Sequence, residues 1–193
     1  MITDIFAQHD GGYAMCGYAH GGGEQRNKGR FWFVVANSEG EERVNRLYPL
    51  DQGGPYGCEF HSVIKCDNSG YLLGGFQPSR GYPFFTVIKT DNDGEIEWNR
   101  TYSTEDEEYG KCFAVLETKA GGFLAVGQSG GAGGRNTFAV RIDVNGDEIW
   151  QSTYEGNQWK AVIETEGGFI LAGGGEGGRY LTVISWTMVY SFN

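Results

Sequence analysis

The sequence predicts an all-β protein in which one structural unit is repeated four times. A Gly-aromatic doublet recurs along the chain at steps of 58, 52 and 46 residues, beginning at Gly12, Gly70, Gly122 and Gly168. The segment 85–102 also matches the segment 138–154 almost position by position. Repeats of this length that contain only strands form radial or stacked arrays, because no single unit buries its own apolar face.

The composition agrees with short strands joined by tight turns. The 193 residues include 33 Gly, 12 Phe, 11 Tyr and 5 Trp, but only 4 Pro. Aromatic side chains fill pleated surfaces, and Gly takes the positive-φ positions that tight turns need. The length suits one large domain with a sizeable core.

Each repeat divides into four strand-like segments. A first strand alternates apolar and polar residues, as in residues 113–118 and 161–165, and a Gly-rich turn leads to a second strand such as residues 13–17. A longer loop then precedes a third strand, which ends in an Asn- or Asp-initiated turn at residues 37–40, 91–94 and 143–146. Asn-Gly and Asp-Gly favour the left-handed conformations of a type I′ hairpin, which joins the third strand to a fourth.

Aromatic residues recur at fixed distances after the turn glycine. The fourth position after it holds Val44, Trp98 and Trp150, and the eighth holds Tyr48, Tyr102 and Tyr154. An even separation on a strand places both side chains on one face. We expect this face to pack against the next sheet, so that Trp98 and Trp150 are buried there. The alternative is an aromatic surface that binds carbohydrate.

These motifs resemble a known class of repeat. The pattern Gly-Gly-[Tyr/Phe]-x-x-x-Gly, followed by Lys-Thr-Asp-x-x-Gly-x-x-x-Trp-x-x-Thr-Tyr, is similar to β-propeller repeats of bacterial and archaeal surface and secreted proteins. It also resembles the kelch pattern at residues 72–75 and Trp98, although two repeats have a single Gly at the end of the second strand, at Gly17 and Gly127. The resemblance implies an interaction or adhesion scaffold located outside the cell or at its surface.

The predicted fold is therefore a single β-propeller domain over residues 1–193, with four blades of four antiparallel strands. The blades are expected at about residues 2–48, 56–102, 109–154 and 158–193. A fragment of a larger ring, completed by a second copy of the chain, is the alternative. The fourth repeat lacks the expected turn after residues 180–184, so its outer strand is unusual or missing. An open edge there would favour a homo-oligomer.

Charge, hydropathy and cysteine spacing exclude several classes. A net charge of −10 argues against nucleic-acid binding, which needs a basic face. No apolar run reaches the ~18 residues of a membrane span, and we recognise no signal peptide, so the chain is cytoplasmic unless a leader has been removed. The cysteines lack the Cys-x-x-Cys spacing of zinc or redox motifs and are expected as buried free thiols: Cys16, Cys58, Cys66 and Cys112.

No pattern predicts catalysis, a metal or a cofactor. His9, His20 and His61 form no spaced constellation with a nucleophile. A calcium loop centred on Gly94 would place Lys89 and Arg100 at ligand positions, where both would repel a cation. The turns also miss the sialidase Asp-box pattern, because Trp follows Gly by four residues instead of three.

One arginine recurs in the loop between the second and third strands of every repeat. These residues, each followed closely by an aromatic side chain, are Arg30, Arg80, Arg135 and Arg179. A guanidinium holds carboxylate or phosphate in bidentate fashion, so the four loops predict an anion or glycan site at the mouth of the channel. The alternative is a rim of salt bridges with the acidic segments between blades. We therefore expect a non-enzymatic binding module for a protein or a small anionic or glycan ligand, with a glycan- or anion-acting enzyme and a self-assembling structural unit as alternatives.

Overall fold

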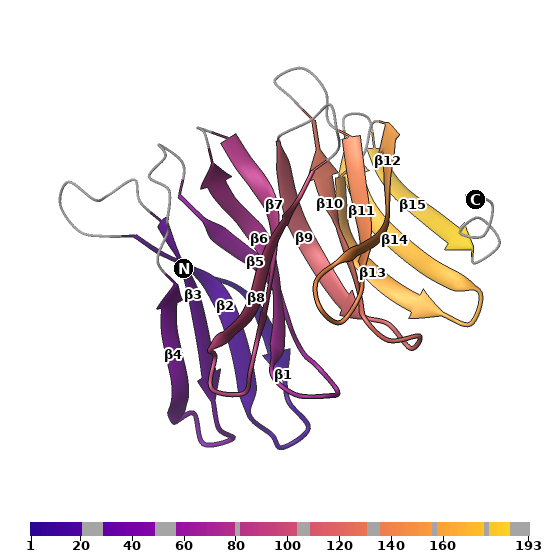
Figure 1. The fold of residues 1–193 in the computed structure, drawn as a ribbon. Coiled ribbons are helices and arrows are strands. Elements are labelled where there is room, and N and C mark those ends of the chain that lie inside the picture. Colours follow the sequence, from indigo (N-terminus) through magenta and orange to yellow (C-terminus); the bar gives the residue numbers. More distant parts are fainter. Residues whose placement is uncertain are drawn as a thin grey trace.

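The chain folds into four successive antiparallel sheets (Figure 1). The computed structural model describes residues 1–20, 29–48, 57–79, 82–103, 109–130, 136–155, 158–175 and 178–185, and these contain strands but no helix. None of the described segments is a helix that could cross a membrane. The sequence-based prediction of an all-β fold with four repeated sheets is confirmed.

Each sheet takes its strands from one continuous stretch of the chain, in chain order. Sheet 1 contains β1 (Ile2–Ala7), β2 (Tyr13–His20), β3 (Gly29–Ala36) and β4 (Glu42–Tyr48). Sheet 2 contains β5 (Glu59–Lys65), β6 (Tyr71–Ser79), β7 (Tyr82–Thr90) and β8 (Ile96–Tyr102). Sheet 3 contains β9 (Gly110–Glu117), β10 (Phe123–Ser129), β11 (Asn136–Ile142) and β12 (Glu148–Glu155). Sheet 4 contains β13 (Gln158–Thr165), β14 (Gly168–Gly175) and β15 (Gly178–Ser185), and the expected fourth strand lies outside the described residues.

The sheets follow one another as an open arc. The first strands of successive sheets pack on each other, β1 on β5, β5 on β9 and β9 on β13, whereas the fourth strands make no contact of that extent outside their own sheets. In the described part of the chain, sheet 1 has no comparable contact with sheet 4, and Figure 1 shows them at opposite ends of the fan. The expected closure of four blades into a ring is therefore not observed, because the sheets do not turn far enough for the last to reach the first.

Apolar side chains fill the space between neighbouring sheets. We define the forward face of a sheet as the side toward the next sheet along the chain, and the backward face as the opposite side. The forward face of sheet 1 places Phe33 and Val35 against Tyr71 and Leu73 on the backward face of sheet 2. Equivalent clusters join sheet 2 to sheet 3 and sheet 3 to sheet 4. The core of this protein therefore consists of a series of inter-sheet layers.

The hairpins between third and fourth strands have the predicted position but a different turn. Asp91 Oδ1 accepts hydrogen bonds from the backbone N–H of Asp93 (2.9 Å) and Glu95 (2.8 Å), and Gly94 N–H donates to Asp91 O at 3.3 Å. Among these turn residues only the glycine has positive φ, +77° at Gly94. A type I′ turn requires two such residues, so the type I′ prediction is wrong. The turn is a type I turn followed by a left-handed glycine, stabilised by the Asp side chain.

The fourth strand of a sheet makes a repeated hydrogen bond to the hairpin turn of the next sheet. Tyr48 Oη donates to Gly94 O, and Tyr102 Oη donates to Gly146 O, each at 2.8 Å. Trp98 is 9% exposed, and its Nε1 donates to Val144 O at 3.1 Å. The predicted burial of Trp98 between sheets is confirmed, while Trp150 is partly buried against the core between sheets 3 and 4.

All four cysteines are buried and free, as predicted from their spacing and apolar context. Burial raises the pKa of Cys58 and of Cys66 to about 12, and it also raises the pKa of Cys16 and Cys112. The thiols therefore stay protonated and act as small apolar core residues.

Candidate inner-edge binding site

A glycine in each second strand shapes the first strand beside it. At Gly17, Gly75, Gly127 and Gly173, an added Cβ would lie within 2.0 Å of a carbonyl oxygen in the first strand or, for Gly17, of the residue just before it. Only glycine permits this close approach. At the same place the first strand contains one residue more than its partner, so a β-bulge forms in every sheet.

The bulged residues occupy equivalent positions on the four first strands. They are Thr3, His61, Phe113 and Lys160. Because the first strands of neighbouring sheets pack side by side, three of these residues from sheets 2, 3 and 4 come together. We call this cluster and its neighbours the inner edge, and it consists of Glu59, His61, Phe76, Lys111, Phe113 and Lys160.

The inner edge combines aromatic rings with two ammonium groups. The His61 ring lies 5.2 Å from the Phe113 ring and 5.7 Å from the Phe76 ring, measured between centroids. Lys111 Nζ lies 4.2 Å from the centre of the Phe76 ring, and Lys160 Nζ lies 5.7 Å from that of Phe113. Both distances suit cation–π attraction.

His61 is uncharged at neutral pH. Burial, together with the charges of Lys111 and Lys160, lowers the pKa of its imidazole to about 4. Its Nε2 is buried without a hydrogen-bond partner and lies 3.9 Å from a carboxylate oxygen of Glu59, too far for a hydrogen bond. Burial also lowers the pKa of Lys111, although Glu59 opposes that shift.

This arrangement has the chemistry of an anion-binding surface. The two lysines supply positive charge, and the neutral imidazole supplies one donor and one acceptor. The partly buried Phe113 ring, which contacts the Lys160 ammonium group, adds an apolar surface. With Glu59 included, the local charge is +1 on a chain whose net charge is −10.

The four predicted arginines are not shown to form a common site. Arg30 is exposed at the start of β3, and the backbone of Arg179 lies at the start of β15, in sheets that do not contact each other. Arg80 and Arg135 lie outside the described residues. Arg30 and the backbone of Arg179 lie at the end of their sheets at which the first strand begins, which is also the end that carries His61.

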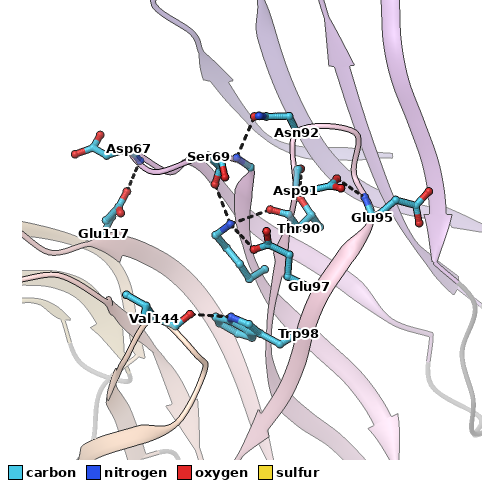
Figure 2. A network of polar contacts seen from close by, with 12 residues as sticks. Asp67, Ser69, Thr90, Asp91, Asn92, Glu95, Glu97, Trp98, Glu117 and Val144 are labelled. Atoms are coloured by element: carbon cyan, nitrogen blue, oxygen red, sulfur yellow. Dashed lines mark hydrogen bonds and ion pairs between the residues drawn. The ribbon is translucent and has the colours of Figure 1, made fainter.

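A second polar cluster is structural. The ammonium group of Lys89 donates to Ser69 O (2.8 Å), Thr90 O (2.9 Å) and a carboxylate oxygen of Glu97 (2.8 Å), as Figure 2 shows. At the equivalent position of sheet 3, the Arg141 guanidinium donates to Phe123 O at 2.9 Å and to Thr118 Oγ1 at 2.6 Å. Each cation links the first hairpin of its sheet to the third strand, so these buried charges are satisfied by groups of their own sheets.

Neighbouring hairpins are linked in the same region. Glu117 on β9 accepts a hydrogen bond from Asp67 N–H at 2.7 Å, and Glu164 on β13 accepts one from Lys119 N–H at 2.8 Å (Figure 2 shows the first).

Within the described residues, no group of three or more His, Cys, Asp or Glu side chains is placed to hold a metal ion. An open hollow of about 510 Å³ between sheets 1 and 2 is lined by Arg43, Val44, Asn45, Arg46, Asp93 and Glu95.

Sequence reasoning missed the inner edge. In the sequence His61 forms no spaced constellation with a nucleophile, and no motif marks Lys111, Phe113 or Lys160. The four bulged residues share no side-chain chemistry, so no repeated motif marks them. The glycine beside each bulge was the available signal, since it recurs in all four repeats.

Comparisons with known proteins identify a similar fold and no family. No family model matches the chain, and no curated protein matches it. A protein of unknown function from Bacteroides caccae, with a crystal structure at 1.35 Å, matches with a TM-score of 0.50 and 12% identity over 88% of this chain. This chain spans 58% of the length of that protein. A glycosyl hydrolase from Bacteroides ovatus matches with a TM-score of 0.34 and 11% identity, over 96% of this chain and 85% of that one, which is too distant to carry an argument. The repeated antiparallel sheets fit a propeller-like repeat fold.

Proposed function

We propose that this protein is a non-enzymatic binding module of the β-propeller type, which holds an anionic ligand on its inner edge. The observation that carries the proposal is the meeting of Lys111, Lys160 and neutral His61 from three different sheets. Carboxylate or sulfate groups of an acidic glycan would pair with the two ammonium groups, and a sugar ring would lie on Phe113. In this proposal the predicted arginine loops would extend the same surface.

The inner edge suits binding because its charges are available to a ligand. Lys160 is exposed, and its ammonium group has only a ring beneath it among the described contacts. The buried cations Lys89 and Arg141, in contrast, are saturated by carbonyl groups of their own sheets.

Calorimetric titration with a hexuronic acid oligosaccharide, and with a neutral hexose oligosaccharide of the same length, tests this proposal. We expect binding of the acidic oligosaccharide alone, weakened about ten- to a hundredfold by either Lys111→Ala or Lys160→Ala, since a charge-assisted hydrogen bond contributes about 1.5–3 kcal/mol. Lys119→Ala, which removes an exposed lysine from the turn before β10, is the matched control and should leave affinity unchanged. Equal loss in all three variants, or no binding of acidic oligosaccharides, would refute the site. Cleavage of the oligosaccharide would favour the enzyme alternative.

A further inference from the structure

The two ends of the arc expose the faces that every internal interface buries. On the backward face of sheet 1, Ile5 is 59% exposed and Tyr13 is 40% exposed. By strand register, Ile5 is equivalent to Val63 in sheet 2, and Tyr13 is equivalent to Tyr71. Val63 is 2% exposed and Tyr71 3%, because sheet 1 covers them.

The forward face of sheet 4 shows the same pattern. Ile163 pairs with Ile170 and is 58% exposed. The equivalent pair in sheet 3 is Leu116 and Leu124, which pack against sheet 4. Nothing in the described part of the chain covers Ile163 in the corresponding way.

We propose that two copies of the chain associate head to tail, with the forward face of sheet 4 in each copy packed on the backward face of sheet 1 in the other. We infer a second copy of the chain as the partner because the three interfaces between sheets within one chain pair the same two kinds of face. In each of the three internal layers, residues of the forward face at positions equivalent to Ile163 pack on residues of the backward face at positions equivalent to Ile5 and Tyr13. Each exposed face is therefore complementary to the opposite end of an identical chain, and the exposed side chains named above, Ile5, Tyr13 and Ile163, are all uncharged.

A closed ring of two copies buries both exposed end faces of each chain. Contacts between unlike faces form rings when the rotation closes, and two copies give a ring of eight sheets. Propellers typically contain about 4–8 blades, so this ring lies within the known range. The proposal does not depend on the ligand proposed above.

Light scattering after size-exclusion chromatography, over a wide concentration range, tests the association. We expect twice the mass of one chain for the parent protein. Ile163→Glu and Ile5→Lys should each weaken association at least about a hundredfold, because each buries a charge in an apolar layer. Ile149→Glu is the matched control, since Ile149 is also 58% exposed but lies on β12 in an internal sheet, and it should remain dimeric. Far-UV circular dichroism should show that all three variants remain folded, because the replaced side chains are exposed.

Mixing the two monomeric variants distinguishes a head-to-tail contact from a symmetric one. An Ile5→Lys chain keeps its forward face and an Ile163→Glu chain keeps its backward face, so the mixture should recover a dimer whose second contact brings opposite charges together. A parent protein that is monomeric at every concentration would overturn the proposal. Loss of association in only one of the two variants, a dimer that survives both, no recovery on mixing, or an open polymer would overturn it as well.

Discussion

Replacing Trp98 by Ala tests whether the layers between sheets hold the fold together. The Trp98 side chain is 9% exposed, lies 6.1 Å from the Phe123 ring between centroids, and belongs to the core between sheets 2 and 3. A buried Trp removes roughly 200 Å² from water, which at about 25 cal/mol per Å² gives an upper value near 5 kcal/mol. The lost hydrogen bond adds little, because Val144 is exposed and its carbonyl regains water.

We therefore expect Trp98→Ala to lower the free energy of unfolding by about 3–5 kcal/mol. Trp150→Ala is the internal comparison, because Trp150 occupies the equivalent position but is only partly buried. Its effect should be about half as large. Urea denaturation followed by far-UV circular dichroism measures both, with the slope checked for a single cooperative transition. A loss below about 1 kcal/mol for Trp98→Ala, or a larger loss for Trp150→Ala, would show that these residues do not form equivalent inter-sheet layers.

Three further predictions follow from repeated contacts and from burial. Tyr48→Phe and Tyr102→Phe should each destabilise the protein by about 1 kcal/mol and by equal amounts in urea denaturation, because each removes one equivalent hydrogen bond to a turn glycine. Lys89→Met should destabilise it by about 2 kcal/mol, since three acceptors lose a buried donor, and a neutral effect would show that the ammonium group is dispensable. The four cysteines should resist a thiol reagent in the native protein and react fully in urea, so rapid native labelling would contradict their burial.

Repeat number, strand order and hairpin position could be predicted from the sequence because they depend on local chemistry. Gly12, Gly70 and their counterparts mark the first turn of each repeat, and the alternation of apolar residues marks the strands beside it. Burial of Trp98 followed from its even spacing to Tyr102, which places both side chains on one face. The predicted type I′ turn was wrong because the Asp91 side chain accepts hydrogen bonds from two backbone N–H groups of the turn. The hairpin therefore needs only one left-handed residue, the glycine.

Ring closure and the inner edge depend on long-range geometry. Whether the last sheet reaches the first is set by the angle between sheets, which depends on the volume of every side chain in the layers and not on any motif. The inner edge arises from a one-residue bulge, and residues as different as His61 and Lys160 occupy it. The anion site predicted from the four recurring arginines stays a prediction, because Arg80 and Arg135 lie outside the described residues.

The measurement that most directly tests the account is the titration of the three histidine side chains by NMR, with His61→Gln used to assign the signal of His61. The central claim is that the first strands of sheets 2, 3 and 4 converge, so that His61 is buried beside Lys111 and Lys160. We expect the His61 imidazole to stay neutral until about pH 4, well below its usual pKa of 6.5.

The same shift fixes a pH dependence of stability. Because the unfolded chain binds this proton below pH 6.5 while the folded chain does not until about pH 4, stability should fall as pH decreases between these values. The part of this loss that comes from His61 should be at most about 3.5 kcal/mol, and this part should be absent from the His61→Gln variant. A His61 pKa near 4 that rises in Lys160→Ala would support the convergence of the three strands. A His61 pKa near 6.5, unaffected by Lys160→Ala, would contradict it.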